Sequence, residues 1–156
     1  MRLCDILTID RIVVDNDGSV VHDKDEALKT LAAMMASPVG VDAKIVEELL
    51  LERERLQSTG IGDGVAIPHT ALDDAEHQAA ALLLCPRGIE FDAIDGGRVT
   101  IIFGVVGPKR ATGEHLRTLA RISRLLRDEA TRTRLVAAAS REEVYGLVAA
   151  HDASGK

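Results

Sequence analysis

The chain has 156 residues, enough for one domain with a substantial core, and its 28% of charged residues is typical of a globular protein. Its net charge of −6 argues against nucleic acid and anionic membranes as partners and favours a partner with a basic face. Aromatic residues make up only 2%, which argues against a stacking platform for single-stranded nucleic acid and against a ring-lined sugar-binding protein.

The sequence shows no segment that would direct it out of the cytoplasm. Its N-terminus lacks a basic stretch followed by an apolar one, and no apolar run approaches the ~20 residues that span a bilayer. Cys4 and Cys85 lack metal-ligand spacing, and their positions neither support nor exclude a disulfide. We therefore expect a cytoplasmic protein without membrane insertion, in which Cys85 is buried as a small hydrophobic residue.

The N-terminal segment predicts a short strand followed by a helix. The strand covers Ile12–Val14 and is closed by the turn signal Asp15–Gly18. Asp23, with Glu26 three residues later, has the pattern of a capped helix start. Apolar residues then recur at helical spacing until Ser37–Gly40, which we expect to end the helix.

A second helix is predicted after Asp42, which has the character of an N-cap. Its expected inner face consists of Ile45, Val46, Leu49 and Leu50. Arg53 lies two turns beyond Ile45 on the same side of this helix. Its side chain is therefore expected to point where Ile45 packs.

The chemistry of the chain is expected in the segment Ser58–His69. Three glycines at alternating positions within Gly60–Gly64 permit unusual backbone conformations and let main-chain N–H groups approach a ligand. Val65–Ile67 predicts a short buried strand, which Pro68 ends because it cannot donate to a ladder. A flexible glycine loop followed by a histidine, His69, at the strand's end predicts a site that handles an anion.

Two further apolar runs predict strands. Ala79–Cys85 is of strand length and is bounded by Pro86–Gly88, and Asp95–Gly97 predicts a tight turn. Val99–Val106 is apolar on both faces, so we expect it in the middle of a sheet that is covered on both sides. Gly107–Pro108 is expected to end it.

Three helices are predicted in the last third of the chain. The first carries His115 at its start, Asp128 caps the second, and Ser140 with Glu143 forms a capping box for the third. Helices on both sides of apolar strands predict the α/β class, with a mixed β-sheet sandwiched between α-helices. We assign a single domain to residues 1–152 and a polar, frayed C-terminal tail to residues 153–156.

A nucleophilic histidine fits the glycine segment better than a nucleotide does. The segment lacks the Gly-Lys-Ser/Thr ending of a P-loop and the Gly-x-Gly-x-x-Gly spacing of a dinucleotide fold. An imidazole such as that of His69 is largely neutral at pH 7 and can accept a phosphoryl group. Arg53, the glycine backbone and His115 could surround the phosphoryl oxygens with positive charge and N–H donors. Two histidines are too few for a metal site.

Structural roles are open for the same residues. His69 could be a hydrogen-bonded structural histidine, His115 could cap its helix or face solvent, and Arg53 could belong to a solvated helix end. Ser58 and Thr59 could bond phosphate oxygens or shape the turn. The remaining histidines lie in polar stretches and are expected to be exposed: His22, His77 and His151.

The segment Arg53–His69 resembles the active-site signature of the IIA component of the phosphoenolpyruvate-dependent phosphotransferase system. The resemblance is to type-2 IIA domains of the fructose/mannitol and nitrogen-regulatory branch. It continues through Phe91–Asp95, Val99–Val106, Gly107–Pro108 and Glu114–Leu119, and so covers about the whole domain. Several separated motifs in the family's order make the match specific.

The resemblance implies that His69 accepts a phosphoryl group from a histidine-containing phosphocarrier protein. It assigns His115 as the second active-site histidine and Arg53 as the active-site arginine. A phosphotransferase with a phosphohistidine intermediate, without a cofactor or metal, is expected. The chain departs from the family at Thr70, where many members carry glycine, and in the long polar segment Asp15–His22. Neither departure removes an active-site residue.

The resemblance leaves open two branches of the family, nitrogen-regulatory and sugar-specific, and a docking module as a different class of function. A chain without fused IIB or IIC segments favours the nitrogen-regulatory type, whose phosphorylation state is read by regulatory target proteins. The alternative is a sugar-specific, fructose/mannitol-type IIA that passes the phosphoryl group to a IIB component. A regulatory docking module that acts without phosphotransfer is the other class. The sequence leaves open the phosphorylated nitrogen and whether the protein is a homo-oligomer.

Overall fold

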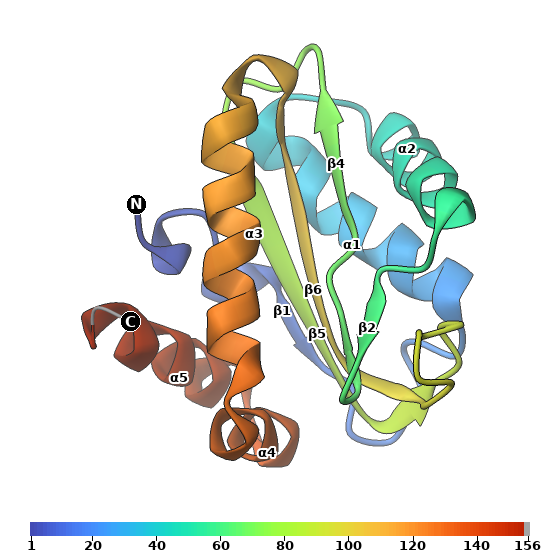
Figure 1. Ribbon diagram of the computed structural model, residues 1–156, viewed down its shortest axis with the longest axis vertical. Helices are drawn as coiled ribbons and strands as arrows, with labels where there is room; N and C mark the ends of the chain where they lie inside the picture. The colour runs from blue at the N-terminus through green and yellow to red at the C-terminus, as the bar shows by residue number, and fades with distance from the viewer. Residues whose placement is uncertain (155–156) are drawn as a thin grey trace.

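The centre of the protein is a six-stranded mixed sheet, seen in the computed structural model, which describes residues 1–154 (Figure 1). Its strands are β1 (Ile12–Val14), β2 (Gly60–Gly62), β3 (Val65–Ala66), β4 (His69–Leu72), β5 (Ala79–Ile89) and β6 (Val99–Pro108). They lie in the order β1-β5-β6-β3-β2, and β4 also pairs with β6. β5 is antiparallel to β6, whereas β3 and β4 are parallel to it. The predicted central position of β6 is confirmed.

Helices cover both faces of this sheet (Figure 1). They are α1 (Lys24–Val39), α2 (Ala43–Leu56), α3 (Thr112–Arg127), α4 (Glu129–Ala137) and α5 (Arg141–Ala153). α1 and α2 pack on one face, and α3, α4 and α5 share the other with the short 3₁₀ turn η1 (Leu3–Asp5). The predicted α/β class, with a mixed sheet between helices, is confirmed.

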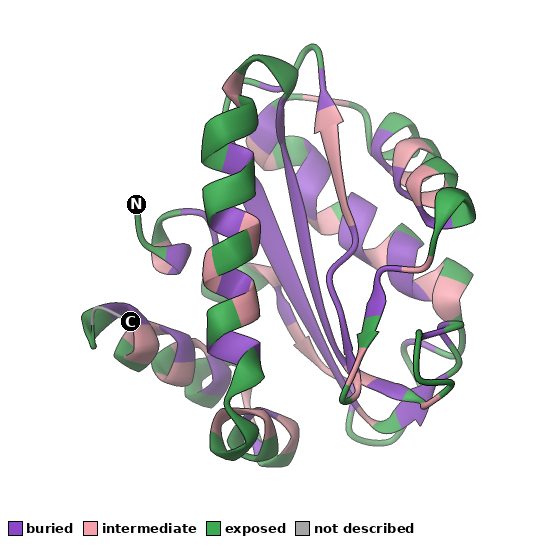
Figure 2. Ribbon diagram, in the orientation of Figure 1, coloured by how far each residue is buried: buried purple, intermediate pink, exposed green. Residues whose placement is uncertain are grey.

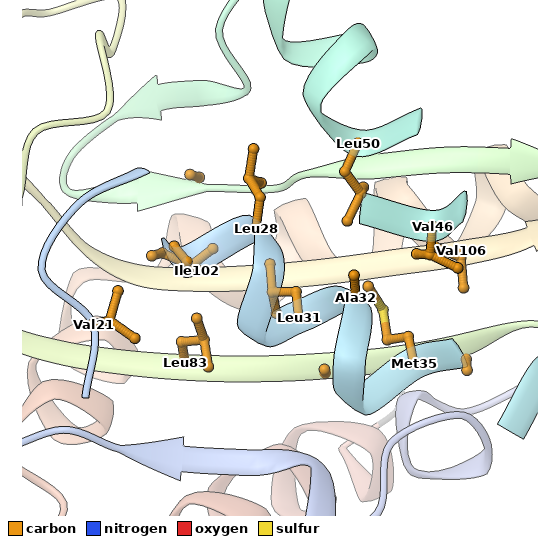
Figure 3. Packing of buried hydrophobic residues seen from close by; sticks show 14 of the residues in the cluster. Val21, Leu28, Leu31, Ala32, Met35, Val46, Leu50, Leu83, Ile102 and Val106 are labelled. Carbon is orange, nitrogen blue, oxygen red and sulfur yellow. The ribbon is translucent and has the colours of Figure 1, made fainter. Parts of the chain in front are cut away.

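Two hydrophobic cores result from the alternation of side chains along the central strands. In β5, Leu83 packs toward α1 and α2, whereas Leu82 and Leu84 pack toward the opposite helices. Figure 2 shows β5 and β6 buried along most of their length. Figure 3 shows the α1 side, where Leu31 and other residues of that helix lie over the sheet. A strand that is buried on both faces must be apolar throughout, as these two are.

The helix boundaries follow from local side-chain caps. The side chains of Asp23, Asp42, Asp128 and Ser140 each accept a hydrogen bond from a backbone N–H in the first turn of the following helix. Gly40 ends α1 in the left-handed conformation, at φ 75°. The predicted starts of these four helices are confirmed.

Two predicted strand ends are wrong. β5 continues through Pro86–Gly88 to Ile89, with a register shift after Leu84. Such an irregularity tolerates a proline, because the stretch from Leu84 to Ile89 faces only Ile101 to Val99 and several of its residues are left out of the ladder. β6 continues through Gly107–Pro108, because β4 pairs with these residues.

The inner face of α2 is narrower than its sequence predicts. Val46 and Leu50 are buried and Glu54 continues their stripe at four-residue spacing, whereas Ile45 is 49% exposed. α2 packs mainly on α1, so only this narrow stripe is covered. Arg53 therefore does not point into the core.

The remaining predictions concern single residues. Cys4 and Cys85 are free thiols, and burial raises the pKa of Cys85 to about 12, so this thiol is inert at neutral pH. His22 and His77 are exposed as predicted, whereas His151 is half-buried. α5 extends to Ala153, one residue into the predicted tail, and residues 155–156 of that tail lie outside the described residues.

The structure also bears on membrane association. Within residues 1–154, none of the helices combines the length and the apolar character that a membrane crossing requires.

Gly104 in the middle of β6 sets how closely α1 approaches the sheet. A Cβ atom there would lie 3.1 Å from both terminal methyl groups of Leu31 and 3.2 Å from Cε of Met35. Gly104→Val should therefore lower the free energy of unfolding by about 1–3 kcal/mol through overpacking. Urea denaturation measures this change. Gly146→Ala is the control, because a Cβ there meets nothing within 4 Å and should leave stability equal or higher.

Candidate active site

The site begins at an interruption between two short strands. β3 and β4 follow one another along the same edge of β6, and Ile67 and Pro68 lie between them. Pro68 has no N–H to donate, but its carbonyl accepts a hydrogen bond from the N–H of Val105 at 3.0 Å. His69 follows this break, as predicted, but it also opens a further strand, β4, which the sequence did not predict. Sequence alone does not show the pairing of β4, because its partner lies over thirty residues later.

The glycine segment forms a β-hairpin rather than an open loop. β2 and β3 are antiparallel, and the turn between them is Asp63–Gly64. Both turn residues have positive φ, 57° and 77°, as a type I′ turn requires. Gly60 is needed for space, since a Cβ there would lie 2.9 Å from Cβ of Ala93. The expected flexible loop of free N–H groups is therefore wrong for this part of the segment.

Ser58 and Thr59 have their hydrogen-bonding groups occupied by the fold. Ser58 Oγ donates to the carbonyl of Phe91 at 2.8 Å and accepts from the N–H of Gly60 at 3.0 Å. The N–H and Oγ1 of Thr59 both donate to the carboxylate of Glu54, at 3.0 Å and 2.7 Å. Of the two roles left open for this pair, the structure supports the shaping of the turn.

Glu54 is a buried charge that holds three segments together. Besides Thr59, it binds Nζ of Lys24 at 2.9 Å, and that ammonium group also lies 5.1 Å from the ring centroid of Phe91. The start of α1, the end of α2 and the glycine segment are thereby tied at one point. Sequence reasoning missed Glu54, although its four-residue spacing from Leu50 was a signal that it lies on the inner stripe of α2.

Arg53 borders the pocket that contains His69. Its guanidinium donates to the carbonyl of Gln57 at 2.9 Å, and within residues 1–154 no Asp or Glu pairs with it. The pocket has a volume of about 280 Å³. Its other walls include Thr59, Ile61, Ile67, Ile94, Leu119 and Ser123. An uncompensated positive charge at the edge of a largely apolar pocket attracts an anion.

The two predicted histidines lie side by side, and His69 is the one that lines this pocket. Their ring centroids are 5.8 Å apart, with the planes tilted by 50°. His69 Nδ1 lies 2.7 Å from the carbonyl oxygen of Ile67. Because a carbonyl only accepts, Nδ1 carries the hydrogen and Nε2 is left with the lone pair. His115, in the first turns of α3, is buried beside it.

Both imidazoles are held in their neutral form. Burial lowers the pKa of His69, opposed by its hydrogen bond to Ile67; Arg53 lowers it further, and Glu54 raises it. Burial also lowers the pKa of His115, and the neighbouring His69 adds to this effect. A neutral ring with a bare nitrogen is the state in which histidine is a nucleophile.

A larger cavity, about 520 Å³, lies on the other side of the end of α2. Among its charged groups, Lys24 is already paired with both Glu54 and Asp92. It contains no histidine or cysteine. Across residues 1–154, no group of three or more His, Cys, Asp or Glu side chains is placed to hold a metal ion. The pocket of His69 is therefore the candidate active site.

The fold and the site define an α/β domain with two neutral histidines and an arginine at a break in one strand edge. Residues 5–151 match the family model described as phosphoenolpyruvate-dependent sugar phosphotransferase system, EIIA 2. The chain belongs to this family, as the resemblance of its motifs predicted.

This chain is similar to nitrogen regulatory proteins and to a mannitol-type IIA protein. The nitrogen regulatory protein of Bradyrhizobium diazoefficiens is 39% identical over 129 residues, which cover 83% of this chain and 84% of that protein. The crystal structure of nitrogen regulatory protein IIA-Ntr from Neisseria meningitidis superimposes with a TM-score of 0.85 at 30% identity, covering 92% and 97%. The Escherichia coli complex of enzyme IIAMTL and phosphorylated enzyme IIBMTL shares the fold, with a TM-score of 0.76 at 20% identity, covering 93% and 99%.

The protonation of the two histidine rings is expected to depend on pH in a defined way. Both rings should titrate below the ordinary value of about 6.5, so His69 keeps its lone pair as the pH falls to 6.5. The unfolded chain binds these protons more readily than the folded chain does. The stability that the neutral rings contribute is therefore fully present above about pH 6.5 and is lost as the pH falls through the folded-state pKa values. NMR titration of both rings, with the urea-unfolded protein as reference, measures this. A folded-state pKa above the reference for either ring would contradict it.

Proposed function

We propose that the protein is a phosphoryl carrier of the phosphotransferase system that accepts the group on Nε2 of His69 from a histidine-containing phosphocarrier protein. One observation carries this proposal: the hydrogen bond from Nδ1 to the carbonyl of Ile67, which leaves Nε2 bare in a pocket beside Arg53. A structural histidine would use both nitrogens in hydrogen bonds within the fold.

The transfer follows from this geometry. The lone pair on Nε2 of His69 attacks the phosphorus, and the electron pair of the breaking P–N bond returns to the imidazole of the donor. Negative charge is spread over three phosphoryl oxygens, so the protein assists mainly by positioning and by neutralising that charge. Arg53 supplies a full positive charge, and His115, whose ring centroid lies 5.8 Å from that of His69, supplies a ring nitrogen.

A protein donor suits the rim of this pocket. Ile61 and Ile94 line it and are 50% and 69% exposed. Large apolar side chains in the open beside a reacting group are typical of a docking surface, because another protein can cover them. A small phosphate ester would not need such a rim.

The nitrogen-regulatory branch is the branch that we propose, supported by the 39% identical relative and by the IIA-Ntr structure. In that branch the downstream partners are regulatory targets. The sugar-specific alternative, with a IIB component as acceptor, is supported by the shared fold of the IIAMTL–IIBMTL complex. Transfer from the phosphorylated protein to a purified IIB component would distinguish the two.

Intact-mass spectrometry tests the carrier function. The protein is incubated at neutral to alkaline pH with phosphoenolpyruvate, enzyme I and the phosphocarrier protein of the same organism. We expect one acid-labile phosphoryl adduct on the wild type and on the control His77→Ala, whose side chain is exposed, and none on His69→Ala. Arg53→Ala should slow uptake by about 10²-fold, as when one charge-stabilising donor is lost. An unmodified wild type with an active donor would leave a docking module on an inherited fold.

The apolar rim is tested separately. Ile94→Asp should raise the KM for the donor protein at least about tenfold, because a charge replaces an apolar contact at the interface. Ile45→Asp is the matched control, since Ile45 is also half-exposed but lies outside the pocket. Initial rates of phosphorylation over a range of donor concentrations give both values. Equal KM values for the two variants would show that the donor docks elsewhere.

A further inference from the structure

Two buried polar atoms next to the site have no hydrogen-bond partner. They are Oε1 of Gln78 and Nδ1 of His115, in side chains whose residues are 3% and 9% exposed. An unpaired polar atom in the interior costs free energy, so each one calls for an explanation. The proposed phosphoryl transfer explains neither.

The two atoms belong to side chains that pack over the same glycine. A Cβ atom on Gly107 would lie 2.9 Å from Cγ of Gln78 and 3.6 Å from Nδ1 of His115. Gly107 stands at the end of β6, where the absence of a side chain lets both neighbours approach. The side chain that carries the unpaired acceptor and the unpaired ring nitrogen therefore both approach the space above Gly107.

The other end of the Gln78 amide fixes which atom it presents. Its Nε2 donates to Oε1 of Glu114 at 2.7 Å. An ionised carboxylate accepts only, so the amide cannot be turned round without losing this bond. The group that remains for His115 is the amide oxygen, and an amide oxygen pairs only with a ring nitrogen that carries hydrogen.

We propose that Gln78 is a positioning residue that accepts the Nδ1–H of His115 and so fixes its tautomer. The structure does not contain this bond, and the Gln78 side chain would have to rotate to form it. The role rests on the proposed function, because His115 matters there as a partner of the phosphoryl group. With Nδ1–H committed to Gln78, the nitrogen free for that group is Nε2.

The tautomer of His115 determines when its Nε2 can donate a hydrogen bond to a phosphoryl oxygen. In the neutral ring Nε2 is bare, so His115 can donate from Nε2 to a phosphoryl oxygen only after it has taken up a proton there. The titratable groups that face His115 are His69, beside it, and Glu114, through the amide of Gln78. Arrival of the phosphoryl dianion at His69 supplies the negative charge that favours this proton.

Long-range ¹H–¹⁵N correlation spectra of the histidine rings test the tautomer directly. In the free wild-type protein at pH 8 we expect the Nδ1–H form at His115, assigned by comparison with His115→Ala. Gln78→Leu should lose this form, and phosphoryl uptake should fall about tenfold, or about 1.4 kcal/mol. The double variant Gln78→Glu with Glu114→Gln exchanges the two partners and keeps an acceptor toward His115. It should recover both the Nδ1–H form and the rate.

A second variant covers the case in which Gln78→Leu does not fold. Gly107→Ala places a methyl group 2.9 Å from Cγ of Gln78, which must move away, so it should also lose the Nδ1–H form. An Nε2–H ring at His115 in the wild type, or an unchanged ring in the Gln78 variant, would overturn the proposal. The tautomer is read without a donor, so a missing adduct on His69 would overturn the proposed function and not this assignment.

Discussion

The site depends on a single break in the ladder along β6. Pro68 cannot donate a hydrogen bond, so β3 ends and β4 begins anew one residue later. The same break leaves the carbonyl of Ile67 outside the ladder, where it accepts from Nδ1 of His69. One residue without an N–H thereby decides the position of His69 and the ring nitrogen that carries its lone pair.

A second constraint holds the opposite wall of the pocket. Glu54 accepts from Thr59 and from Lys24, and it directly follows Arg53 in the chain. A buried carboxylate of this kind is costly unless all its bonds are made, so its neighbours are held closely in place. The uncompensated charge of Arg53 is thus carried on a helix end that is held in place beside the pocket of His69.

Local patterns predicted much of this fold, whereas long-range pairing was out of reach. The caps at Asp23 and Asp128 and the central place of β6 depend on residues that are close in sequence, and these predictions are confirmed. The strand opened by His69 depends on a partner strand far along the chain. The burial of Glu54 likewise depends on how α2 packs on α1. The family motif named His69, His115 and Arg53, but it contained no sign of Gln78, whose importance comes from two unpaired atoms.

Both histidines are attached to β6 in different ways. His69 pairs with the strand at Val105, and His115 follows the strand in sequence after one 3₁₀ turn, η3 (Lys109–Ala111). Their separation is therefore set within about ten residues of chain, independently of α4 and α5. Local unfolding of those two helices, as seen by hydrogen exchange, would leave the pair of rings in register. The separation of the two rings is therefore lost only when β4, β6 or the first turns of α3 open, and β6 is among the most deeply buried strands of the protein.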